Sequence, residues 1–77
     1  MDETQLKQFL GESVFNDIKG QIQKIEGSLE TTKNHYGDYM HIFGMTQDKQ
    51  KRLVMANIFL ILGANPLGVK DALTILG

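Results

Sequence analysis

The residues best suited to chemistry gather in one segment, residues 31–45, which holds both histidines and both tyrosines of the chain. A histidine titrates near neutral pH, and a carboxylate such as Asp38 could orient it for acid–base work. The sequence offers no nucleophile to complete such a site, because it has no cysteine and its two serines, Ser13 and Ser28, fall in helical pattern. We therefore expect a non-enzymatic protein.

Metal and cofactor sites are not expected either. Two histidines without any cysteine are too few for a structural zinc site. His35 and His41 are six residues apart and would lie on different sides of a continuous helix. No glycine-rich loop follows a predicted strand, so the sequence predicts no phosphate-binding cofactor site.

The same aromatic segment, together with a short basic run, is the predicted partner-binding surface. The basic residues fall at the start of a predicted helix, where the helix dipole disfavours cations. Their placement therefore favours an acidic partner over a local stabilising role. The predicted partner-binding residues are Tyr36, Tyr39, His41, Phe43, Lys49, Lys51 and Arg52.

Length and composition predict one small domain spanning residues 1–77. A chain this short buries only about 60% of its unfolded surface, so tight helix packing or self-association should support it. The net charge of −1 gives no general attraction to nucleic acid or anionic lipid. The first residues lack the basic and apolar regions of a signal peptide, and we expect a cytoplasmic protein.

Apolar residues recur at helical spacing along most of the chain, and no long segment alternates with period two. Asp2 and Gln5 resemble a capping pair, Gly11 could divide the first helix from the second, and Asn65-Pro66 resembles a helix start. The predicted fold is an all-α bundle of about four helices, joined by the aromatic and histidine-rich segment 31–45. Their approximate ranges are 3–10, 13–30, 47–62 and 66–76.

Residues 53–62 contain a single polar residue, Asn57. A helix apolar on all sides is normally wrapped by other helices, so we expect this one at the centre of the core. The run is too short to cross a bilayer, which needs about 20 apolar residues. Asn57 should either hydrogen-bond to loop backbone within one chain or pair with its equivalent across a symmetric interface.

These features favour a small protein–protein interaction module, of the phage- or plasmid-type accessory kind that inhibits or adapts a larger host protein. We also expect a homodimer, with Leu6, Phe9, Phe15 and Asn57 at its interface. The alternative is a helix-turn-helix DNA-binding regulator using residues 46–76. That alternative is the weaker one, because the predicted second helix offers only Lys70, Asp71 and Thr74 as polar side chains.

Overall fold

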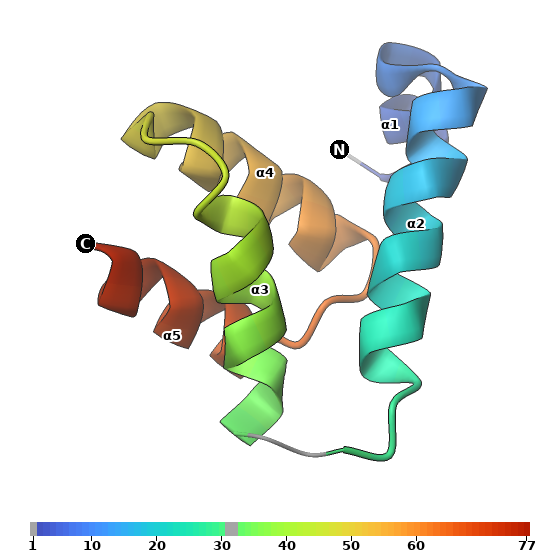
Figure 1. Ribbon diagram of the computed structural model, residues 1–77. Coiled ribbons are helices and arrows are strands. Elements are labelled where there is room, and N and C mark those ends of the chain that lie inside the picture. Colours follow the sequence, from blue (N-terminus) through green and yellow to red (C-terminus); the bar gives the residue numbers. More distant parts are fainter. Residues whose placement is uncertain (1, 31–32) are drawn as a thin grey trace.

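The computed structural model describes residues 2–30 and 33–77 and places them in five α-helices and one short 3-10 turn (Figure 1). The described residues contain no strand, which confirms the predicted all-α class. The predicted connecting segment 31–45 contains a helix of its own, so the bundle has one helix more than expected. The elements are α1 (Glu3–Leu10), α2 (Glu12–Glu26), η1 (Lys33–His35), α3 (Tyr36–Phe43), α4 (Lys49–Ile61) and α5 (Pro66–Leu76).

Local capping signals fix several helix ends where the sequence predicts them. Asp2 and Gln5 form a capping box at the start of α1. Asn65 accepts hydrogen bonds from the N–H groups of Leu67 and Gly68, and Pro66 begins α5. Gly11 has φ of 88° and separates α1 from α2, a conformation that suits glycine.

Two other helix ends differ from the prediction, and the start of α3 was not predicted. Helix α2 ends at Glu26 instead of residue 30, and Leu29, which lies within the predicted range, is 99% exposed. Helix α4 begins at Lys49 instead of residue 47, and Asp48 caps it by accepting hydrogen bonds from the N–H groups of Gln50 and Lys51. Helix α3 begins at Tyr36, because Lys33, Asn34 and His35 all adopt the left-handed conformation and reverse the chain just before it.

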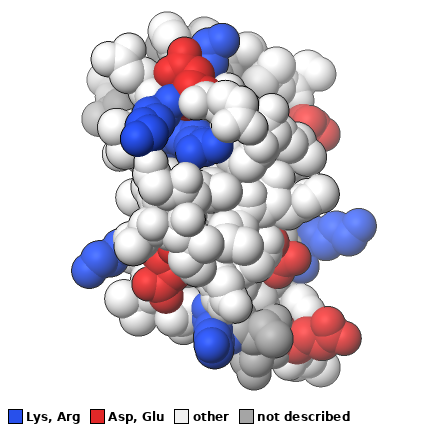
Figure 2. Space-filling model, turned by 60° about the vertical axis from the view of Figure 1, so that its left-hand side comes forward, with Lys and Arg blue, Asp and Glu red and all other residues white. Residues whose placement is uncertain are grey.

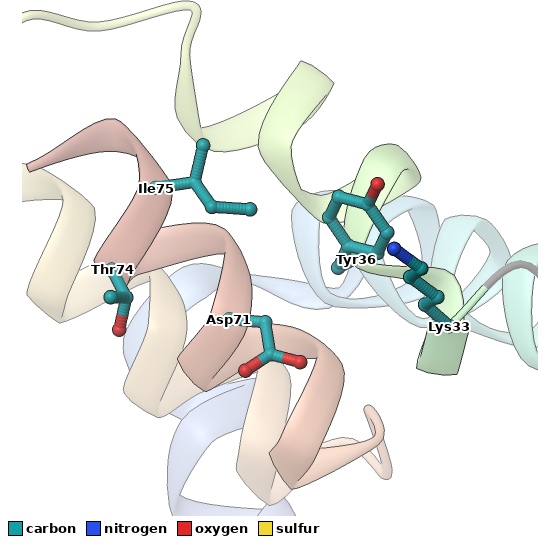
Figure 3. A pocket seen from close by; sticks show the side chains of 5 residues that line it. All are labelled: Lys33, Tyr36, Asp71, Thr74 and Ile75. Carbon is teal, nitrogen blue, oxygen red and sulfur yellow. The ribbon is translucent and has the colours of Figure 1, made fainter.

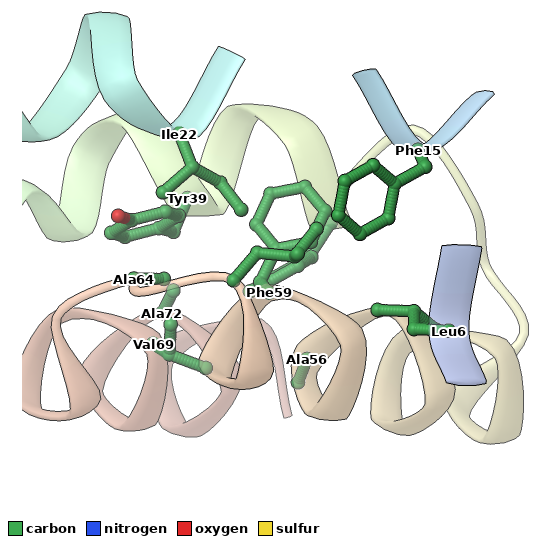
Figure 4. Packing of buried hydrophobic residues seen from close by; sticks show 11 residues of the cluster. Leu6, Phe15, Ile22, Tyr39, Ala56, Phe59, Ala64, Val69 and Ala72 are labelled. Carbon is green, nitrogen blue, oxygen red and sulfur yellow. The ribbon is translucent and has the colours of Figure 1, made fainter. Parts of the chain in front are cut away.

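Helix α3 forms the centre of the core. Tyr39 and Phe43 are fully buried, and their rings pack against Phe59 with centroid separations of 6.2 and 5.3 Å. Helix α3 has its most extensive contact with α5, while α2 and α4 complete the surroundings (Figures 1 and 4). Helix α3, which the prediction treated as part of a connecting segment, therefore lies at the centre of the core.

The prediction that residues 53–62 are wrapped on all sides is wrong. Helix α4 buries Ala56 and Phe59 against the core, but Leu53 and Val54 are 56% and 57% exposed. Asn57 and Leu60 are exposed as well. Figure 4 shows the buried side chains gathered on one side of α4 and α5. A chain of 77 residues has too few helices to cover the other side of α4.

No helix in residues 2–30 or 33–77 is long and apolar enough to cross a membrane.

Candidate functional site

Three of the predicted partner-binding residues are buried, and two of them, Tyr39 and Phe43, are not available to a partner. Tyr39 and Phe43 lie in the aromatic core, and Arg52 is only 7% exposed. The two aromatic residues are four positions apart and share the inner face of α3, which is the pattern of a core stripe. Their assignment to a partner surface is wrong because the inner face of α3 is enclosed by the rest of the chain.

Arg52 joins α3 to α4. Its Nε donates hydrogen bonds to the backbone carbonyls of Thr46 at 2.9 Å and Phe43 at 3.2 Å. These charge-assisted bonds hold the turn between the two helices. Among the described residues, no carboxylate lies within 4.0 Å of the guanidinium, so its positive charge has no ion-pair partner.

A second polar junction ties α2, α3 and the α4–α5 turn together. Glu26 Oε1 accepts hydrogen bonds from the Tyr39 hydroxyl at 3.0 Å and from Asn65 N–H at 2.9 Å. Burial raises the pKa of Tyr39 above its ordinary value, and the hydrogen bond to Glu26 and the negative charge of Glu26 raise it further. The carboxylate therefore acts as a structural acceptor here.

The acid–base cluster considered from the sequence is not assembled. His35 Nδ1 lies 3.7 Å from Asp38 Oδ2, too far for a hydrogen bond. His35 is buried, whereas His41 is exposed on α3. The Tyr39 hydroxyl is directed to Glu26 instead of to a histidine.

The outer side of α5 carries a small open hollow of about 270 Å³. Lys33 and Tyr36 lie on one side of it, with the lysine Nζ 5.9 Å from the tyrosine ring centroid. Asp71, Thr74 and Ile75 of α5 lie on the other (Figure 3). Its one described acid, Asp71, and one described base, Lys33, give the hollow no strong preference for a charged ligand.

The predicted dimer-interface residues fall into two groups. Leu6 and Phe15 are buried in the core of the single chain, so their assignment to a subunit interface is wrong. They face inward because α1 folds back against α2 and both helices close one end of the core. Phe9 and Asn57 are exposed and remain accessible to a partner.

A groove runs between α4 and α5 on their outer side, and we call it the α4–α5 groove. It consists of two hollows of about 270 and 160 Å³, which adjoin each other because Leu53 and Leu73 line both. Most of the lining is apolar. The lining residues are Lys49, Arg52, Leu53, Ala56, Asn57 and Leu60 of α4, with Pro66, Val69, Lys70, Leu73, Thr74 and Gly77 of the α5 segment.

Sequence reasoning missed most of this groove because two helices build it together. The spacing of Lys49, Leu53, Ala56 and Leu60 marks one face of a helix, but the surrounding run is apolar on every side. Of the predicted site residues, Lys49, Arg52 and Asn57 line the groove, while Lys51 is exposed beside it.

The charged side chains that line the α4–α5 groove have one sign. Lys49 and Arg52 line one hollow and Lys70 lines the other, and no described Asp or Glu side chain lines either. Asp48 directly precedes Lys49, but its carboxylate accepts hydrogen bonds from the N–H groups of Gln50 and Lys51 at the start of α4. Figure 2 shows a face on which basic and acidic side chains lie together near the top and across the lower half, with an uncharged band between the two groups.

Comparisons with known proteins give no match among protein-family models, curated proteins or solved structures. In residues 2–30 and 33–77, no three His, Cys, Asp or Glu side chains come together in a way that could hold a metal ion. The function therefore has to be argued from the surface of the chain itself.

Proposed function

We propose that this chain is a small non-enzymatic protein–protein interaction module that binds the surface of a larger protein through the α4–α5 groove. A phage- or plasmid-type accessory factor, which inhibits or adapts its target by occupying a surface, fits this size and composition. The observation that carries the proposal is the exposure of Leu53, Val54 and Leu60 on a helix whose other side is in the core.

Contiguous apolar surface distinguishes a binding site from ordinary surface leucines. Isolated exposed apolar residues are normal, whereas a continuous apolar patch usually marks an interaction site. Leu53, Leu60 and Leu73 line one continuous groove, and Leu67 adds an exposed apolar side chain on α5. Covering this groove would remove apolar area from water, which is the main source of affinity in protein association.

A matched pair of variants tests the proposal. The chain is immobilised and native-host extract is passed over wild type, over Leu53→Glu/Leu60→Glu and over Leu29→Glu. Leu29 is a fully exposed leucine outside the groove and is the control. We expect wild type and Leu29→Glu to retain the same protein and the groove variant to lose it, with helical content unchanged by circular dichroism. Equal retention by all three would contradict the proposal.

The DNA-binding alternative predicts a different behaviour. Lys49 and Lys51 are exposed at the start of α4 and could contact phosphates. The exposed side chains of α5 include Leu67, Asp71 and Ile75, which provide few hydrogen bonds for reading the edges of the bases. A gel shift with random duplex DNA at low salt that is abolished in Lys49→Gln/Lys51→Gln would favour a DNA-binding regulator.

A further inference from the structure

Resting on the proposed function, we infer that the α4–α5 groove receives an amphipathic helix of the partner protein, with an apolar stripe flanked by acidic side chains. Each wall of the groove is a helix, and its floor contains small or buried residues such as Ala56 and Val69. A helix laid between two helices is one of the recurring modes of peptide recognition.

The dimensions suit a short helix. Helix α4 has 13 residues and α5 has 11, so at about 1.5 Å per residue the walls are roughly 20 and 16 Å long. A partner helix of about three turns spans that length, and its apolar residues at i, i+3 or i+4, and i+7 would contact Leu53, Leu60 and Leu73.

The basic side chains that line the groove favour acidic residues on both sides of the apolar stripe of the partner helix. Arg52 is more than nine-tenths buried, lines the hollow beside Lys49, and has no carboxylate within 4.0 Å among the described residues. Because the positive charge of Arg52 is buried and has no ion-pair partner, a carboxylate of the partner would contribute most to the binding free energy at this position. Lys70 supplies a second cation in the neighbouring hollow. An acidic side chain toward each end of the partner helix would complement both.

Two other occupants fit this groove less well. A second copy of the chain seated on the same face would bring two sets of Lys49, Arg52 and Lys70 together, which is unfavourable. A nucleic acid would be attracted by the cations, but its phosphates would leave the leucine walls uncovered. The acidic amphipathic helix satisfies both the apolar walls and the cations.

The test uses fluorescence anisotropy with the full chain and two designed helical peptides of about 14 residues that share one leucine stripe. One peptide carries glutamate on its flanks and the other carries lysine at the same positions. Roughly tenfold tighter binding of the glutamate peptide is expected. The preference should reverse in Lys49→Glu/Lys70→Glu. It should persist in Lys24→Glu/Lys33→Glu, which changes the net charge equally outside the groove.

Several results would overturn the inference. Equal binding of the two peptides, or the same preference in both double variants, would show that the groove does not select acidic flanks. Sedimentation as a dimer that Leu53→Glu dissociates and the glutamate peptide does not would assign the groove to a second copy. If the partner captured from host extract is lost in Leu53→Glu/Leu60→Glu but kept in Lys49→Glu/Lys70→Glu, this inference fails while the proposed function stands.

Discussion

At the scale of single residues, one buried and one half-buried polar side chain join separate elements of the fold. Arg52 fastens the α3–α4 turn through two carbonyls, and Glu26 joins Tyr39 to the backbone of Asn65. Both side chains use hydrogen bonds to backbone or hydroxyl groups instead of salt bridges. Removing a buried polar partner of this kind usually costs more than the bond contributes, because the group left behind is desolvated.

Replacing Arg52 should weaken the fold. We expect Arg52→Met to lower the free energy of unfolding by about 2 kcal/mol, because the carbonyls of Phe43 and Thr46 lose a charged donor. Urea unfolding followed by circular dichroism measures the loss. Lys51→Met, at an exposed neighbouring position, is the matched control and should change stability by less than about 0.5 kcal/mol. Equal losses of stability in the two variants would show that Arg52 does not stabilise the α3–α4 turn.

The raised pKa of Tyr39 predicts a loss of stability in alkali. Above pH 10 the unfolded chain releases the tyrosine proton while the folded chain keeps it, so the unfolded state binds fewer protons and stability falls as pH rises. We expect Tyr39→Phe to lose about 1 kcal/mol at neutral pH through the missing hydrogen bond to Glu26. The same variant should lose less than wild type between about pH 9.5 and 11. Parallel stability curves for the two proteins would contradict this role of Tyr39.

At the scale of elements, local signals predicted the helix ends that local chemistry decides. Asp2, Gly11 and Asn65-Pro66 act through their own backbone neighbours, so the sequence shows where α1 and α5 begin and where α1 ends. The start of α3 follows no such rule, because three consecutive residues, none of them glycine, adopt the left-handed conformation. That turn is supported by packing that no local pattern reveals.

The close approach of η1 to α5 gives an element-scale prediction. Gly68 lies under the backbone of Asn34, and a Cβ added there would overlap the Asn34 carbonyl oxygen. We expect Gly68→Ala to destabilise the fold by roughly 2 kcal/mol, because η1 must move away from α5. Gly20→Ala in α2 meets open space and should instead stabilise by up to about 1 kcal/mol. Thermal unfolding of both variants checks the contrast, and a neutral Gly68→Ala would show that the two segments are not in contact.

The position of α4 shows the limit of sequence reasoning about elements. The hydropathy of α4 indicates that its residues prefer to be buried away from water. Burying all of them would require more helices than a short chain has. The sequence therefore predicted a helix in the right place and the wrong surroundings for it. Asn57 illustrates the same point, since it looked like a buried amide and is exposed beside the groove.

At the scale of the whole molecule, the helices cover one side of α4 and α5 and leave the other side open. The predicted homodimer is a separate proposal, and Phe9 is the exposed predicted contact residue that lies outside the α4–α5 groove. We expect Asn57→Leu to keep the helical content of the wild type. If Asn57 lies at a dimer contact, the substitution should change one sedimenting species into several. An unchanged single dimer would place the contact elsewhere, and a wild type that stays monomeric at high concentration would refute the dimer.

The α4–α5 groove is the proposed binding surface for the partner. The most direct measurement is a map of backbone amide chemical shifts in the full chain, recorded while the glutamate-flanked helical peptide is added. We predict that the largest shifts occur at Leu53, Asn57, Leu60, Lys70 and Leu73, and that the amides of the exposed residues Val14 and Leu29 stay unchanged. Shifts centred on α1 and α2, with the groove residues unaffected, would contradict the proposal.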